Sequence, residues 1–329
     1  MDFPVLSTVL LAPLIAAFAL CFVDKENRDL IRKVAAGAMI FALCFTLYAF
    51  FNFDTAVGGV QFAEKIPWVE DLGVCYSVGV DGISMPLLLL SDVIGVSAVY
   101  TSWNTEKRAK EFFILLLLLI AGVTGTFIAR DLFIFLLSYE LFVIPVFVMV
   151  LVWGSTKRLP KEFVAMKFIV FLLMGSAFML VGVVMLYVTA YPAGERTFDF
   201  EALRLAEEMG HFSEDFQIFA FPLLLLGFGS LLSMFPFHSW SPDGHAAAPT
   251  AVSMIHAGIL KKLGAYGLIR VGVLLLPLGA KYWSPLIVTT AVMGVLYAAY
   301  IVMAQKDLKY IIGYSSVSHM GYILLGIMT

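Results

Sequence analysis

Two adjacent lysines, Lys261 and Lys262, stand in the segment AGILKKLGAYGL, which otherwise reads as helix buried in lipid. A charge at the bilayer centre costs roughly 2.5–3.5 kcal/mol on insertion scales, so charged side chains there are usually functional. A desolvated lysine releases its proton more readily than one in water, which makes it a candidate proton carrier. We expect Lys262 to be such a relay. For Lys261, a relay and a structural pairing with a neighbouring subunit's carboxylate are equally open.

Glu140 lies near the middle of another apolar run, DLFIFLLSYELFVIPVFVMVLVW. A carboxylate at this depth either pairs with a cation or stays protonated, and both states suit a group that exchanges protons. The alternative is a structural glutamate hydrogen-bonded between helices, but intramembrane ionisable groups are functional by default, so we favour proton exchange. Asp92, in LLLLSDVIGVS, has no partner nearby in the sequence, and we expect one on another helix or chain.

Three further titratable groups lie within apolar segments: His256, His319 and Lys167. A single helical histidine more often satisfies hydrogen bonds than carries protons, but histidines near lysines are well placed to relay them. His256 comes six residues before Lys262, and His319 lies in YSSVSHMGY. Lys167 stands one turn into its segment, where it either relays protons or extends its ammonium group to the membrane surface. Both interpretations stay open for each of the three.

The stretch FPFHSWSPDGHAAAPTA, residues 235–251, combines prolines with polar side chains. We expect Pro236 to end one membrane span, and the later prolines to prevent any helix from continuing. Non-helical backbone at membrane depth is tolerated only inside protein or beside a cavity, and broken helices mark ion sites in transporters. The alternative is an ordinary loop. The histidines lack zinc-site spacing, so we predict no metal here. The residues expected to form this broken-helix loop are Pro236, His238, Trp240, Asp243, His245 and Pro249.

The composition decides which elements must position these groups. The chain has 329 residues, of which 61% are hydrophobic and 14% charged, so it is an integral membrane protein rather than a soluble domain. The net charge of −3 does not favour nucleic acid as a partner. The three cysteines lie far apart, and the sequence has no CxxC, GxGxxG or P-loop pattern. We therefore expect no iron–sulfur cluster, haem, zinc or other redox centre on this chain.

Apolar runs of about 20 residues mark membrane-spanning helices. We predict an all-α polytopic protein with about ten of them, at 4–23, 33–52, 82–101, 112–129, 132–153, 163–190, 216–236, 250–275, 284–304 and 308–328. The first is predicted to be a retained span rather than a signal peptide, because no basic residue precedes it. Residues 53–80 are expected to form a hairpin, and TFDFEALRLAEEMG a short surface helix that stops at Gly210.

The loop charges predict the orientation of the chain. The odd-numbered loops hold twelve basic residues, namely Lys25, Arg28, Arg32, Lys33, Lys107, Arg108, Lys110, Lys157, Arg158, Lys161, Lys306 and Lys309. The even-numbered loops hold six, namely Lys65, Arg130, Arg196, Arg204, Arg270 and Lys281. Because basic loops stay on the cytoplasmic side, we place the odd loops inside and the N-terminus outside, in the cell inner (cytoplasmic) membrane.

Five segments together resemble the antiporter-like membrane subunits of respiratory complex I, the NADH:quinone oxidoreductase, and most closely their chain M (mitochondrial subunit 4) type. These segments are GVDGISMPLLLL, SYELFVIPVFVMVLVWG, FPFHSWSPDGHAAAPTAVS, AGILKKLGAYGLIR and AQKDLKYIIGYSSVSHMGYILLGI. They span nearly the whole chain in the family's order. Subunits of Mrp-type sodium/proton antiporters share weaker versions of the same signatures.

The resemblance implies an inverted repeat of helices, each half with a broken helix and a half-channel. Residues 1–110 would form the first three helices, 111–280 the first repeat and 281–329 the start of the second. Family members have about fourteen spans, so the second repeat is expected to be cut short. The resemblance thus implies either an incomplete gene product or half of a split subunit, with another chain supplying the missing helices.

The resemblance also implies residue roles. Glu140 matches the family's span-five glutamate, Lys262 its central span-eight lysine, and His319 the histidine that opens the second repeat, with Lys261 an extra. The family usually has a lysine five residues before the proline of the broken-helix motif, but this chain has Leu231. Glu140 then lacks its expected partner. It is either held neutral or paired with another cation such as Lys167 or Lys261, or pumping through this unit is altered.

The leading hypothesis is a proton-translocating subunit of a complex I-type quinone oxidoreductase. FMN, iron–sulfur clusters and quinone are then expected on partner subunits, membrane and peripheral, and none on this chain. The alternatives are an Mrp-type sodium/proton antiporter subunit and a non-pumping scaffold subunit. The sequence leaves open the electron donor, the quinone type and whether the coupling ion is a proton or sodium.

Overall fold

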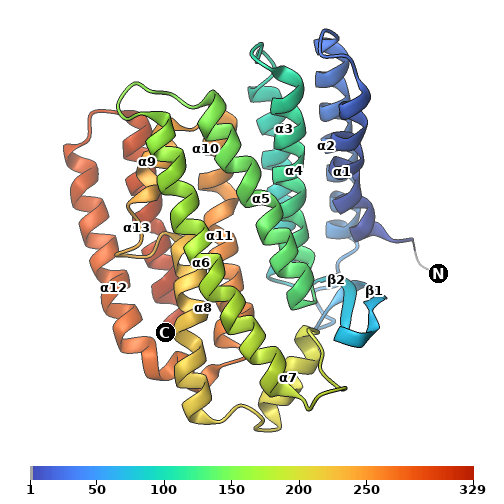
Figure 1. The fold of residues 1–329 in the computed structure, drawn as a ribbon, viewed down its shortest axis with the longest axis vertical. Helices are drawn as coiled ribbons and strands as arrows, with labels where there is room; N and C mark the ends of the chain where they lie inside the picture. The colour runs from blue at the N-terminus through green and yellow to red at the C-terminus, as the bar shows by residue number, and fades with distance from the viewer. Residues whose placement is uncertain (1–2) are drawn as a thin grey trace.

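The computed structural model describes residues 3–329, which form a helical bundle with one two-stranded hairpin (Figure 1). The helices are α1 (Val5–Phe22), α2 (Arg28–Phe51), α3 (Ser84–Thr101), α4 (Ala109–Ile128), α5 (Leu132–Trp153), α6 (Lys161–Ala190), α7 (Phe200–Glu208), α8 (Glu214–Leu232), α9 (Trp240–Ala247), α10 (Thr250–Ile255), α11 (Lys261–Gly267), α12 (Pro277–Ala304) and α13 (Leu308–Met328). Two π-helical segments, η2 (His256–Leu260) and η3 (Leu268–Val273), flank α11, and a short 3₁₀ turn, η1 (Glu70–Leu72), lies in the hairpin.

The predicted membrane spans are present in the structure. Nine helices of residues 3–329 are long and apolar enough to cross a membrane. The tenth expected span is one continuous run of α10, η2, α11 and η3, whose separate pieces are each short. The expected polytopic, almost entirely helical fold is therefore confirmed.

Two predicted helix starts were wrong. The second span begins at Arg28 rather than at residue 33, because the Asn27 side chain caps it by accepting from the Leu30 N–H at 3.2 Å. The ninth begins at Pro277 rather than at 284, since proline is well suited to the first turn of a helix. Composition alone missed both because the first turns of these helices contain charged or small residues.

The loops separate cleanly between the two ends of the bundle. The connections α1–α2, α3–α4, α5–α6 and α12–α13 lie together at the top of Figure 1, while the hairpin and α7 lie at the bottom. Strands β1 (Gln61–Val69) and β2 (Val74–Val80) pair antiparallel, which confirms the predicted hairpin. The predicted surface helix is α7, and Gly210 follows it with φ +77°. The basic odd-numbered loops therefore share one end.

The chain breaks between α8 and α9. Helix α8 ends at Leu232, four residues before the expected end, and Ser233 takes up a left-handed conformation with φ +63°. The expectation that no helix follows was wrong, because α9 forms with Pro242 as its third residue. A proline in the first turn removes only an N–H that has no partner within the helix. Pro249 does follow the end of α9, and it occupies the N-cap position of α10.

Candidate functional site

Two histidines stack on one another across the break between α9 and α10. The rings of His245, on α9, and His256, at the start of η2, have centroids 4.1 Å apart and are nearly parallel. Both side chains are buried. The Trp240 indole stacks on His256 at 5.0 Å and donates its N–H to the Ser230 carbonyl at 3.1 Å. The structure thus joins three residues that the sequence singled out separately.

Lys261 extends this stack to α13. Its ammonium group is fully buried and donates to the Ser316 hydroxyl. The same hydroxyl oxygen lies 3.5 Å from His245 Nε2 and donates to the Gly313 carbonyl at 2.8 Å. A hydroxyl both donates and accepts, so Ser316 can connect a lysine to a histidine. Ser316 was not among the residues predicted from the sequence, although the polar pair Ser315–Ser316 inside an apolar helix is a usable signal.

Lys262 points elsewhere. Its side chain is half-buried, and its ammonium group donates at 2.8 Å to the carbonyl of Ala257, five residues earlier on the same span. A π turn leaves such a carbonyl without its usual partner four residues on. The structure therefore brings Lys261, rather than Lys262, to Ser316 and His245.

Lys167 forms an ion pair with the broken-helix segment. Its Nζ lies 2.8 Å from Asp243 Oδ2 and 3.0 Å from the Ser239 carbonyl, and both charged side chains are largely buried. The Tyr310 hydroxyl, on α13, donates to the other Asp243 oxygen at 3.2 Å. Lys167 neither extends to the surface nor pairs with Glu140. Asp243 is thus held by one cation and one hydroxyl from two different helices.

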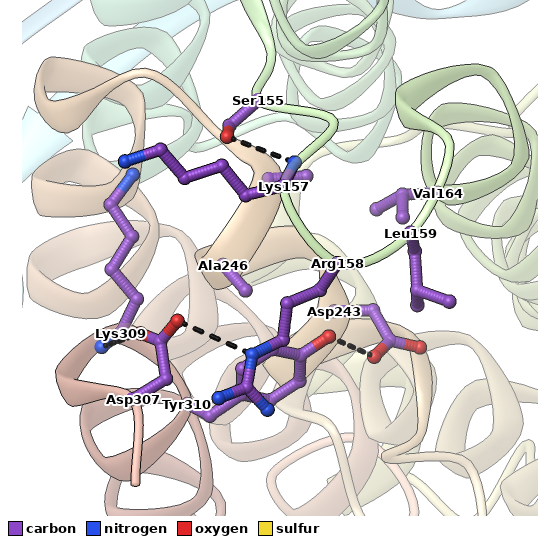
Figure 2. Close-up of a pocket in the computed structure, with 11 residues that line it drawn as sticks. Ser155, Lys157, Arg158, Leu159, Val164, Asp243, Ala246, Asp307, Lys309 and Tyr310 are labelled. Atoms are coloured by element: carbon purple, nitrogen blue, oxygen red, sulfur yellow. Dashed lines mark hydrogen bonds and ion pairs between the residues drawn. The ribbon is translucent and has the colours of Figure 1, made fainter.

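A cavity of about 420 Å³ reaches this carboxylate from the end of the bundle that carries the odd loops (Figure 2). Arg158 closes part of its rim, with Nε 3.5 Å from Asp307 Oδ2 and the guanidinium 5.2 Å from the centre of the Tyr310 ring. The residues that line the cavity are Ser155, Lys157, Arg158, Leu159, Val164, Asp243, Ala246, Ala247, Asp307, Lys309 and Tyr310. Asp243 is thus part of the cavity wall.

Three candidate residues lie outside this group. Glu140 is half-buried on α5 and forms no hydrogen bond or ion pair within residues 3–329. His319 is exposed on α13. His238 is buried before α9, its ring stacks on Phe235 at 5.4 Å, and its Nδ1 has no partner in the described part of the chain.

Two other sequence observations have a structural answer. Leu231 is buried in α8 with 1% of its surface exposed, so the core around it is apolar where the family resemblance led us to look for a lysine. Asp92 is also buried and accepts a hydrogen bond from the Thr46 hydroxyl of α2. The expected partner of Asp92 on another helix is therefore present.

Comparison with known proteins decides the family. Residues 129–329 match the family described as "NADH:quinone oxidoreductase/Mrp antiporter, TM". The chain belongs to this family. A similar relative, "NAD(P)H-quinone oxidoreductase chain 4-2" of Synechocystis sp. (strain ATCC 27184 / PCC 6803 / Kazusa), is 36% identical over 326 residues, covering 99% of this chain and 56% of the relative. This family member thus spans little more than half the length of that curated relative.

Solved structures agree with the assignment. A chain of "Respiratory complex I from Thermus thermophilus with bound NADH" matches with a TM-score of 0.85 and 28% identity, covering 98% of this chain and 64% of that one. A chain of the Mrp complex from Dietzia sp. DQ12-45-1b matches with a TM-score of 0.76 and 21% identity, covering 99% and 33%. The latter likeness concerns the fold alone. The resemblance inferred from the five sequence segments is confirmed.

Proposed function

We propose that this chain is a proton-translocating membrane subunit of a complex I-type quinone oxidoreductase. The observation that carries the proposal is the buried row Lys261–Ser316–His245–His256, which crosses a break in the membrane helices. The names of its relatives support the redox partner. In this proposal the chain is part of an enzyme through its assembly, while FMN, iron–sulfur clusters and quinone are held by other membrane and peripheral subunits.

The geometry supports a path that begins at the cavity. Water there delivers a proton to the Asp243 carboxylate, which Lys167 and Tyr310 hold in place. His245, on the same helix, presents Nε2 to Ser316. Residues two apart on a helix point to nearly opposite faces, so in this proposal water carries the proton from Asp243 to His245. Ser316 then passes its hydroxyl proton to the neutral Lys261 amine as it receives one from His245. Each step transfers one proton between a donor and an acceptor, and no group gains a second charge.

The remaining candidates keep their proposed roles. Lys262 and Glu140 are proton carriers, and His319 a further one toward the second repeat. We also keep the proposed division of the chain into residues 1–110, 111–280 and 281–329. The basic loops support a location in the cell inner (cytoplasmic) membrane with the N-terminus outside, so the cavity opens to the cytoplasm. Lys261 is added to the main path because it alone of the two lysines contacts Ser316.

The first experiment is gentle solubilisation of native membranes, affinity isolation of the chain and mass spectrometry of what accompanies it. We expect iron–sulfur and quinone-site subunits, and a chain that supplies further helices if the subunit is split. Small antiporter subunits without redox proteins would instead favour an Mrp-type assembly, and sodium-dependent proton exchange in vesicles then becomes the assay.

A second experiment distinguishes a pump from a scaffold. Lys261→Met in the assembled complex should abolish quinone-dependent acidification of inverted vesicles while electron transfer to quinone is retained or slowed. Lys306→Gln, in the exposed α12–α13 loop, is the control and should behave as the unaltered protein. Full acidification by both the Lys261→Met and the Lys262→Met complexes would leave a scaffold as the better description.

A further inference from the structure

Two ammonium groups without a carboxylate partner lie in the cavity beside α9. Lys157 and Lys309 both line it, and Figure 2 shows their side chains extending to the same end. Their charges repel one another. Neither forms an ion pair within residues 3–329: the nearby Asp307 pairs with Arg158, and it attracts Lys309 from beyond ion-pair distance more strongly than Lys157 repels it. The pair is therefore an excess of positive charge at one place.

Lys309 makes this excess costly. Its side chain is half-buried, and its only hydrogen-bond acceptor in the described structure is the Ala248 carbonyl, at 2.8 Å. A partly desolvated cation is stabilised chiefly by an anion within contact distance, and a single carbonyl replaces that poorly. An anion placed between the two ammonium groups would turn their repulsion into two attractive contacts.

A third donor belongs to the same wall. The Ser155 hydroxyl oxygen lies 3.4 Å from the Lys157 backbone N–H and accepts from it, so the hydroxyl proton is free to donate. Two ammonium groups and a hydroxyl suit an oxyanion that has several acceptor oxygens and at least one negative charge. Lysine binds phosphate well as a point charge, without the planar fork of arginine.

The position of the cavity indicates where such an anion comes from. Helix α6 begins at Lys161 and α13 at Leu308, so the cavity lies where membrane helices end and lipid headgroups begin. Basic pockets between membrane helices at this level bind anionic headgroups. We propose that Lys157, Lys309 and Ser155 bind a phosphate group, either free or in the headgroup of an anionic phospholipid. This inference does not depend on the proposed function.

The test measures binding rather than transport. The purified chain in detergent is titrated with phosphatidylglycerol and, separately, with inorganic phosphate, and bound molecules are counted by native mass spectrometry. Phosphatidylcholine is the neutral reference lipid. We expect the paired change Lys157→Gln and Lys309→Gln to weaken binding at least about tenfold, the ratio expected on losing one charge-assisted hydrogen bond. Lys157→Gln alone, at an exposed position, should weaken it less and cannot disturb the core.

The control is Lys306→Gln, which removes an exposed lysine of the α12–α13 loop that does not line the cavity, and binding should not change. Binding of phosphatidylglycerol that inorganic phosphate does not displace identifies the lipid as the ligand. Equal binding of both identifies the phosphate group itself. The proposal is overturned if the paired variant binds as the unaltered chain does, or if Lys306→Gln weakens binding equally.

Discussion

Lys261, Ser316, His245 and His256 contact one another in a row, whereas Glu140 of α5 stands apart from them. Around the breaks, ends of short helices meet, and hydroxyl and imidazole groups connect Lys261 to His245. Helix α5 is a single apolar helix of 22 residues, and its one carboxylate has no partner in the described chain. A break in a membrane helix thus gathers charges into a site, while an intact helix carries them singly.

The comparison implies that the aromatic stack around the breaks stabilises the fold. The strongest test is Trp240→Ala, which removes the ring stacked on His256 and its bond to the Ser230 carbonyl. Truncating a buried tryptophan costs roughly 3–5 kcal/mol, and the free energy of unfolding should fall by that amount in a denaturation experiment. Trp68→Ala, at an exposed position of the hairpin, is the matched control. Equal stability of the two variants would contradict a structural role for the stack.

The next largest effect should show which of the neighbouring lysines, Lys261 or Lys262, carries the proton. Lys261→Met should reduce proton translocation by about 100-fold or more, the range expected for loss of a proton-transfer group. Stability should stay the same or rise, because an apolar side chain replaces a fully buried charge. Lys262→Met, measured in the same vesicles, sharpens the result. If Lys262→Met stops translocation and Lys261→Met does not, the path does not run through Ser316.

The Lys167–Asp243 pair should contribute a smaller amount. Both side chains retain some exposure, so we expect Lys167→Met to lower the free energy of unfolding by about 1–2 kcal/mol, less than for a fully buried pair. A double-mutant cycle with Asp243→Asn should return a coupling of at least about 0.5 kcal/mol. Additive effects of the two changes would mean that the pair is not energetically linked.

The free energy of unfolding should depend on pH through Asp81, a carboxylate outside the membrane spans that has cationic partners. Burial acts to raise the pKa of Asp81, but the Ser84 N–H, Arg270 and Arg130 outweigh it and hold this pKa below its usual value. The stabilisation is therefore present above the unfolded-state pKa of about 3.9 and is lost as the pH falls through the lower folded-state value. Asp81→Asn should lower the free energy of unfolding by about 1 kcal/mol at pH 7. It should also reduce the fall in thermal stability that the unaltered protein shows at acidic pH. An unchanged fall in the variant would exclude Asp81 as its source.

The smallest effect on stability is expected at Glu140. Glu140→Gln breaks no contact in the described structure, so the free energy of unfolding should change by less than about 0.5 kcal/mol. Translocation should nevertheless fall, because an amide cannot carry a proton. A large loss of stability would reveal a partner supplied by another subunit and would weaken the contrast with the broken-helix region.

The membrane spans could be predicted from the sequence because each buries a continuous apolar run, and a helix satisfies its own backbone in lipid. Their ends could not be placed where capping decides, as at Asn27 and Pro277. The helix around Pro242 was missed because proline was treated as a breaker even in a first turn. Which lysine meets Ser316 depends on how α11 is rotated against α13, and one sequence does not contain that rotation.

The two π-helical segments on either side of α11 determine how this helix is rotated. Each π turn contains one residue more than the α turn it replaces, so its position along the span sets the rotation of everything beyond it. Moving one such turn past α11 would turn this short helix by about 100°, which is the angle between neighbouring residues. Such a move would carry Lys261 away from Ser316 and change the direction of Lys262. The positions of the two π turns thus fix which of the two ammonium groups faces α13.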